Sequence, residues 1–230
     1  MQRQKIIEYK DWYLPERDTP GKKLIDKNFQ CTKVLPFALK HVKQFRRALD
    51  IGAWIGDSTK FLAQQFTEVI AFEASAITFE CCVKNMQKYN INNVTVNQIG
   101  ISNTTGVKNF YTRQKSTNSA WISNNEPPKD LITLDPVQIQ TTTLDELMIH
   151  PVDFVKIDVD SHEGFVIEGA KKWLRQTKPV IMLENKEVAH NRQSDDMPNP
   201  DTLLRELGYT MVAQIDKADY IYVPQNYNKP

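Results

Sequence analysis

The sequence predicts an α/β fold with a doubly wound, mostly parallel sheet that a C-terminal antiparallel hairpin closes. Short apolar segments of strand length alternate with segments of helical periodicity between residues 47 and 207. Segments such as residues 179–183 (PVIML) lack polar alternation, which is typical of strands buried on both faces. Alternating strands and helices favour parallel pairing with right-handed crossovers.

The first half of this pattern contains three strands and two helices. The strands are expected at residues 47–51, 68–73 and 93–100. A helix at residues 56–66 places Leu62 and Phe66 on one face, and the next helix carries Phe79, Val83 and Met86 at helical spacing. Two further strands are expected at 107–112 and 136–143, with a polar insertion at 113–136 between them.

The second half continues the alternation. Buried strands are expected at residues 152–159 and 178–184. One helix at 164–177 directs Val166, Ala170 and Trp173 inward, and a second over 201–207 begins after Asn199 and Pro200 and ends at Gly208. Residues 208–216 and 219–224 are expected to form the antiparallel pair.

Residues 1–45 are expected to form an N-terminal arm that packs on the core and rims the site. The arm is polar and aromatic up to residue 30, and Leu35, Leu39 and Val42 then indicate a helix. Residues 46–230 are expected to be one domain.

The bulk composition excludes some classes of partner. Twenty-nine basic and twenty-eight acidic residues leave a net charge of +1, so nucleic acid is an unlikely partner. No apolar run approaches the roughly 18 residues of a membrane span, and the N-terminus is too polar for a signal peptide. With three cysteines, the chain is expected to be cytoplasmic.

The segment LDIGAWIGDST, residues 49–59, is typical of a nucleoside-binding loop. Asp50 and Gly52 end the first strand, and the turn through Ala53, Trp54 and Gly56 leads to a helix start at Asp57 and Ser58. Such a start offers N–H groups to an anion, and a glycine lets a ligand approach the backbone. Glu73 ends the second strand, where a carboxylate can accept hydrogen bonds from ribose hydroxyls. The alternative is that both glycines only make a turn.

The spacing favours S-adenosylmethionine over a dinucleotide. A dinucleotide site has the pattern G-x-G-x-x-G, but Ala53 and Trp54 stand where the pyrophosphate needs open backbone. Asp50 would repel a phosphate and help to hold an ammonium group. The P-loop pattern is absent from the sequence.

A cluster of charged residues, KIDVDSHE at 156–163, lies at the end of a predicted central strand, on which Asp158 and Asp160 are expected to point to the same face. We expect His162 to be the general base for a hydroxyl acceptor and Asp158 to lie near the methionine end of the cofactor. Asp160 or Glu163 is expected to orient His162 or to cap the following helix. Two alternatives stay open: Glu163 only stabilises the helix N-terminus, and His162 is only a loop histidine.

Three of these residues, Asp158, Asp160 and His162, together with Glu184 also offer ligands for Mg²⁺ or Mn²⁺. Adjacent ligands on one short strand seldom complete a coordination shell, so we expect no metal.

These motifs resemble the FkbM family of S-adenosylmethionine-dependent methyltransferases, from about Arg47 to Glu184. The matching segments are LDIGAWIGDST, AFEAS, VNQIGIS, TTLDEL and DFVKIDVDSHEGFVIEGA. In the last of these, the family pattern is matched by Lys156, Ile157, Asp158, Val159, His162, Glu163, Gly169 and Ala170. The resemblance implies a Rossmann-like class I methyltransferase fold and adds Ala74, Gly100 and Ile101 to the cofactor site.

The sequence also departs from the family. Asp160 stands where the family usually has Glu, Ser161 where it usually has Gly, and Ala74 where proline is common. We expect Ser161 to change the position of His162.

The resemblance implies methyl transfer to oxygen, often on sugars, so we expect the acceptor to be a saccharide or a glycosylated small molecule. Residues 113–136 and 186–200 and the arm should rim the acceptor side, with Trp12, Tyr13, Asn118, Ser119, Trp121, His190 and Arg192 as candidate contacts. The alternatives are a nucleic-acid or protein methyltransferase, and a non-catalytic module that binds the cofactor.

Overall fold

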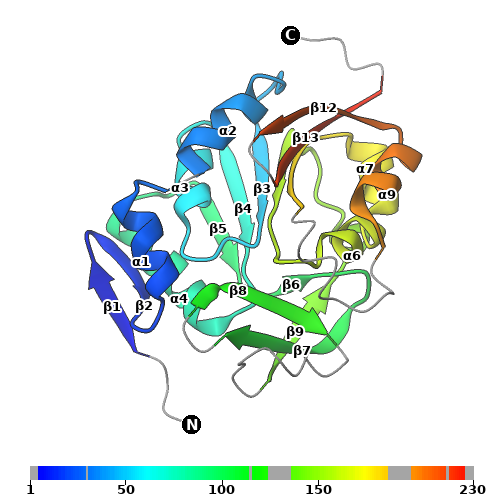
Figure 1. Cartoon of the computed structure of the whole chain (residues 1–230). Coiled ribbons are helices and arrows are strands. Elements are labelled where there is room, and N and C mark those ends of the chain that lie inside the picture. Colours follow the sequence, from blue (N-terminus) through cyan, green and yellow to red (C-terminus); the bar gives the residue numbers. More distant parts are fainter. Residues whose placement is uncertain are drawn as a thin grey trace.

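The computed structural model describes residues 5–29, 31–113, 116–123, 136–185, 198–215 and 218–225. Its largest element is a seven-stranded sheet in the order β12-β13-β11-β10-β3-β4-β5 (Figure 1). The strands are β3 (Arg47–Ile51), β4 (Glu68–Phe72), β5 (Val94–Asn97), β10 (Phe154–Ile157), β11 (Val180–Glu184), β12 (Tyr209–Ile215) and β13 (Asp219–Pro224).

The strand pairing confirms the predicted doubly wound sheet. The five strands β5, β4, β3, β10 and β11 are parallel, and β13 pairs antiparallel with both β11 and β12. The chain runs from β3 toward β5 on one side and from β10 toward β13 on the other. The order therefore reverses between β3 and β10, which is where ligands bind in open α/β sheets.

Helices cover both faces of this sheet. One core contains Ala48 and Phe154 from the sheet with Leu35 from α2 (Cys31–Leu39) and Leu62 from α3 (Asp57–Ala63). Helix α4 (Ala76–Lys88) packs beside them through Cys82 and Met86. The other face is covered by α6 (Glu163–Glu168), α7 (Lys171–Thr177) and α9 (Pro200–Glu206).

Two predicted elements are wrong in their extent. The helix expected at 164–177 is broken into α6 and α7, and a Cβ on Gly169 would lie 2.1 Å from the carbonyl oxygen of Ser102. The strand expected at 93–100 ends at Asn97, because the chain there leaves the large sheet for a second one.

The second sheet has four strands in the order β6-β9-β7-β8. They are β6 (Gly100–Ile101), β7 (Gly106–Arg113), β8 (Ser116–Ser123) and β9 (Val137–Thr142). The sequence predicted β7 and β9, but residues 116–123 were expected in a loop and instead pair antiparallel with β7. This sheet lies below the large one in Figure 1, and the short helix α5 (Leu144–Leu147) follows it.

The N-terminal arm contains a hairpin and a helix that were not predicted from the sequence, in addition to the helix that was expected. It forms a hairpin of β1 (Ile6–Tyr9) and β2 (Trp12–Pro15), then α1 (Thr19–Asp26) and α2. Asn85 of α4, which is fully buried, holds the hairpin in place. Its amide oxygen accepts from the Tyr13 N–H at 2.7 Å, and its amide nitrogen donates to the carbonyl oxygens of Tyr13 at 2.9 Å and Ile55 at 2.8 Å.

No helix of the described ranges is long and apolar enough to cross a membrane.

We predict that Asn85→Ala destabilises the protein by about 2 kcal/mol, because buried backbone groups of the arm and the loop lose their partners. For a chain of this size, that lowers the melting temperature by roughly 4–8 °C in thermal denaturation. Asn92→Ala, at an exposed position nearby, is the matched control and should leave the melting temperature unchanged. Equal melting of both variants would show that the arm docks without these bonds.

Candidate active site

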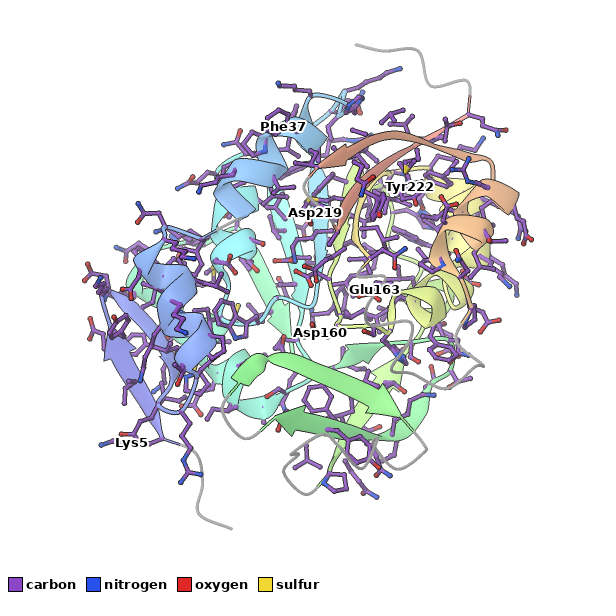
Figure 2. All side chains as sticks on the ribbon, in the orientation of Figure 1. Lys5, Phe37, Asp160, Glu163, Asp219 and Tyr222 are labelled. Atoms are coloured by element: carbon purple, nitrogen blue, oxygen red, sulfur yellow. The ribbon has the colours of Figure 1, made fainter. Side chains whose placement is uncertain are left out.

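A cavity of about 340 Å³ opens at the carboxyl ends of β3, β4 and β10. Its floor is formed by residues that follow these strands, and the arm and the second sheet contribute its other walls. Figure 2 places Asp160 near the boundary between the two sheets, below Asp219 and Glu163. The apolar lining includes Leu24, Phe29, Val34, Ile51, Phe72, Ile99, Ile101, Phe110, Ile122, Val159 and Met182.

The predicted cofactor residues divide into two groups. Those that line the cavity are Gly52, Trp54, Asp57, Ser58, Glu73, Ala74, Gly100, Ile101 and Asp158. Asp50, Ala53 and Gly56 are buried and lie behind this lining. Their positions support a structural role in shaping the loop.

Packing requires both loop glycines. Gly52 has a φ of +87°, and a Cβ there would lie 1.9 Å from the carbonyl oxygen of Asp158. Gly56 has a φ of +92°, and its Cβ would meet Cys82 Sγ and Met86 Cε at 2.8 Å. The two glycines thus allow close packing of the loop against the end of β10 and against α4, in addition to shaping one wall of the cavity.

Much of the hydrogen-bonding capacity of the loop is used within the protein. The N–H groups of Gly52 and Ala53 donate to the carbonyl oxygen of Phe72 at 2.9 and 3.0 Å. The Gly56 N–H donates to the carbonyl oxygen of Ala53 at 2.8 Å. The loop therefore offers fewer free donors to a ligand than the sequence indicated.

Glu73 connects the loop to the end of β4. Its Oε2 accepts from the Trp54 N–H at 2.8 Å, and its Oε1 accepts from the Ser75 N–H at 2.9 Å and the Thr78 hydroxyl at 2.8 Å. Burial raises the pKa of Glu73, although these hydrogen bonds oppose the shift. A carboxylate has about four acceptor positions, so one remains on Oε2 for a ribose hydroxyl.

Asp50, Lys156 and Asp158 form a charged network between β3 and β10. The Lys156 ammonium donates to Asp158 Oδ2 at 2.9 Å and lies 3.8 Å from Asp50 Oδ1. Thr59 of α3 donates to Asp50 Oδ2 at 2.6 Å. Burial raises the pKa of Asp50 to about 6, against the attraction of Lys156 and the Thr59 hydrogen bond. Burial alone would lower the pKa of Lys156, but the charges of Asp158 and Asp50 outweigh it and hold this pKa above its usual value.

In the turn after β10, the charged side chains of residues 158–163 point in different directions. Asp160 and Ser161 have φ values of +49° and +72°, a conformation that side chains other than glycine rarely adopt. Asp158 and Asp160 line the cavity, whereas His162 and Glu163 are both 3% exposed and lie outside its lining. The structure thus brings two of the four expected catalytic residues to the cavity.

His162 lies in a position that does not support direct proton abstraction. Its Nε2 is 2.9 Å from the Ser102 hydroxyl, and its ring packs on Phe165 with centroids 4.8 Å apart. Burial, with a contribution from Lys108, lowers the pKa of His162 to about 3. The imidazole is therefore neutral, and it faces Ser102 instead of the cavity.

Glu163 holds the turn together. Its Oε1 accepts from the N–H groups of Ser161 at 3.1 Å and Val159 at 3.3 Å. Burial raises the pKa of Glu163 to about 7; the charges of Asp158 and Asp160 add to the shift, and backbone hydrogen bonds oppose it. This geometry favours the alternative in which Glu163 supports the start of α6.

Lys156, Glu184 and Asp219 line the cavity, although none was predicted as a cofactor or catalytic residue. From the sequence, Lys156 was named only as a match to the family pattern and Glu184 only as a possible metal ligand. Lys156 could have been identified from the sequence, because it is a charged residue within an otherwise apolar predicted strand. Glu184 and Asp219 are opposite each other on β11 and β13, so the strand pairing alone brings them together.

The charge of the cavity is mainly negative. Its described lining contains six carboxyl side chains, Asp57, Glu73, Asp158, Asp160, Glu184 and Asp219, and a single cationic side chain, Lys156. Such a lining fits a ligand with a sulfonium and an ammonium group better than it fits a pyrophosphate. Within the described ranges, no three His, Cys, Asp or Glu side chains converge to hold a metal ion.

Of the expected acceptor contacts, His190 and Arg192 lie outside the described residues, as do the side chains of Asn118, Ser119 and Trp121. Trp12 and Tyr13 belong to the arm hairpin but do not line this cavity.

We predict that Ser161→Gly stabilises the protein by about 0.5–1 kcal/mol. Glycine relieves the strain of the positive φ, although it gains more freedom in the unfolded chain. Ser161→Ala keeps the strained Cβ and is the matched control, which should give no gain. Chemical denaturation of both variants measures the difference, and a less stable glycine variant would contradict the prediction.

Comparison with known proteins tests the family resemblance. The Methyltransferase FkbM domain matches residues 50–211. No curated protein matches the chain.

Two solved structures are among those to which the chain is similar. The crystal structure of Methyltransferase FkbM from Methylobacillus flagellatus has a TM-score of 0.53 and 18% identity, over 77% of this chain and 43% of that one. This chain thus corresponds to less than half of that protein's length. A SAM-dependent methyltransferase from Aquifex aeolicus has a TM-score of 0.49 and 16% identity, over 90% of this chain and 93% of that one.

The first structure confirms the predicted fold class, and the domain match covers more than half of the chain. The match includes the glycine loop, Glu73 and the turn after β10, and membership of this family implies S-adenosylmethionine as the cofactor. The chain belongs to the FkbM family of S-adenosylmethionine-dependent methyltransferases.

Proposed function

We propose that the protein methylates a hydroxyl oxygen of a saccharide or glycosylated small molecule. The observation that carries this proposal is the acid-lined cavity at the carboxyl ends of β3, β4 and β10. Carboxylates accept hydrogen bonds from hydroxyl groups, which a polyhydroxylated acceptor offers in number. The same carboxylates repel a phosphate backbone, which disfavours a nucleic-acid acceptor.

Held at the glycine loop and Glu73, S-adenosylmethionine would supply an electrophilic methyl group to the acceptor oxygen, and its sulfur would keep the electron pair of the methyl–sulfur bond. The protein has to place the acceptor hydroxyl in line and to accept its proton. Asp160 is our choice for the base, because it lines the cavity, whereas His162 and Glu163 lie outside the lining and we place Asp158 at the methionine end of the cofactor. We therefore assign the role of general base to Asp160 instead of His162.

The direct test is transfer of labelled methyl from S-adenosylmethionine to a panel of glycosides, RNA and proteins. Label on the oxygen of a glycoside supports the proposal. Label on RNA or protein instead identifies one of the other acceptor classes. Absence of transfer to every class, with the cofactor bound, favours a non-catalytic binding module.

We predict that Asp160→Asn lowers kcat by about 10²–10⁴-fold and leaves the affinity for S-adenosylmethionine within a few-fold, because only proton transfer is lost. Steady-state assays and calorimetry separate the two effects. His162→Gln is the comparison, since glutamine can keep a hydrogen bond to Ser102. If His162→Gln abolishes transfer while stability and cofactor affinity persist, histidine is the base after all.

We predict that Glu73→Gln weakens S-adenosylmethionine binding by at least about tenfold, or 1.4 kcal/mol. The amide removes the charge that faces the ribose and puts a donor group among the Trp54, Ser75 and Thr78 donors. Calorimetric titration measures the loss. Glu80→Gln, exposed on the outside of α4, is the matched control and should bind normally. An unchanged affinity in Glu73→Gln would place the ribose elsewhere.

A further inference from the structure

We propose that Lys156 binds the α-carboxylate of the methionine part of S-adenosylmethionine. Lys156 lies in β10, whose four residues are all buried, and only 7% of its side chain is exposed. A buried lysine in a central strand is costly unless its charge is compensated. Its position therefore calls for a reason beyond packing.

The neighbours of Lys156 direct its ammonium group to the strand ends. In the parallel register, Lys156 pairs with Asp50 on β3 and with Met182 on β11. Asp158, two residues along, accepts its hydrogen bond at 2.9 Å, and Asp50 Oδ1 lies 3.8 Å away, beyond hydrogen-bonding distance. The ammonium has three donors, so the described residues leave it capacity toward the cavity that it lines.

The backbone N–H donors of the turn from Gly52 to Gly56 are largely engaged within the protein. The N–H groups of Gly52, Ala53 and Gly56 donate to backbone carbonyl oxygens, and the Trp54 N–H donates to Glu73. Among the described residues that line the cavity, Lys156 is the single cation. An anionic group that enters the cavity therefore meets one complementary charge.

The amino-acid end of the cofactor matches this arrangement. It carries a carboxylate and an ammonium group on one carbon, and the Lys156–Asp158 pair presents a cation and an anion side by side. With the carboxylate on Lys156, the cofactor ammonium is next to Asp158. The charges of Asp158 and Asp50 hold the pKa of Lys156 above its usual value, so the ammonium is charged at neutral pH.

Decarboxylated S-adenosylmethionine tests this assignment, because it lacks only the carboxylate. We predict that Lys156→Met weakens S-adenosylmethionine binding at least about tenfold more than it weakens binding of the decarboxylated compound. Calorimetric titration gives the four dissociation constants, and Lys156→Arg should retain much of the wild-type discrimination. Met182→Leu changes a neighbouring wall without a charge, and its discrimination should equal that of the wild type.

If Lys156→Met weakens both ligands equally, Lys156 only positions Asp158 and the assignment is wrong. Lys156→Gln provides a second neutral variant if the methionine variant does not fold. In the wild type, the NMR signal of the Lys156 ε-methylene, assigned by its loss in Lys156→Arg, should respond more strongly to S-adenosylmethionine than to the decarboxylated compound. Equal responses would overturn the proposal. Because it concerns the cofactor alone, the inference holds whichever acceptor the glycoside test identifies.

Discussion

The contact between the ends of β3 and β10 determines the rest of the site. The Asp158 N–H donates to the carbonyl oxygen of Ile51 at 3.0 Å, and the Asp158 carbonyl then passes so close to Gly52 that no Cβ fits between them. This approach aligns Lys156 with Asp50 across the strands and brings the Asp158 side chain to the cavity. Because Gly52 has no side chain, the glycine loop after β3 and the turn after β10 can form one wall of the cavity together.

Features that repeat along the chain could be predicted from the sequence, and those that depend on a single distant contact could not. Apolar runs such as VIML identified the buried parallel strands, and the spacing of Gly52 and Glu73 identified neighbouring strand ends. The break between α6 and α7 depends on Gly169 touching the Ser102 backbone, which no local pattern encodes. Strand β8 was not predicted, because its mostly polar sequence, STNSAWIS, is typical of a loop. It forms a strand by pairing with β7, which is distant information that the segment itself does not contain.

The site shows the same division. Sequence placed Asp158, Asp160, His162 and Glu163 at one strand end, and all four are there. The strand was expected to continue to Val159, with Asp158 and Asp160 on one face. The positive φ of Asp160 and Ser161 instead ends the strand geometry, and His162 and Glu163 turn into the protein. The burial of His162 decides whether its ring can take up a proton. This burial depends on the contact that His162, at the start of α6, makes with Ser102, which the local sequence pattern does not contain.

The hydrogen bonds of Asn85 make the N-terminal hairpin and the cofactor loop parts of one assembly. A single amide group contacts Tyr13 in the arm and Ile55 in the loop, so these two segments share a partner although they are 42 residues apart in sequence. An arm transplanted from another protein would have to bring a backbone donor and acceptor to the same place. The position of the cofactor loop therefore limits which backbone geometry of an arm can dock on α4.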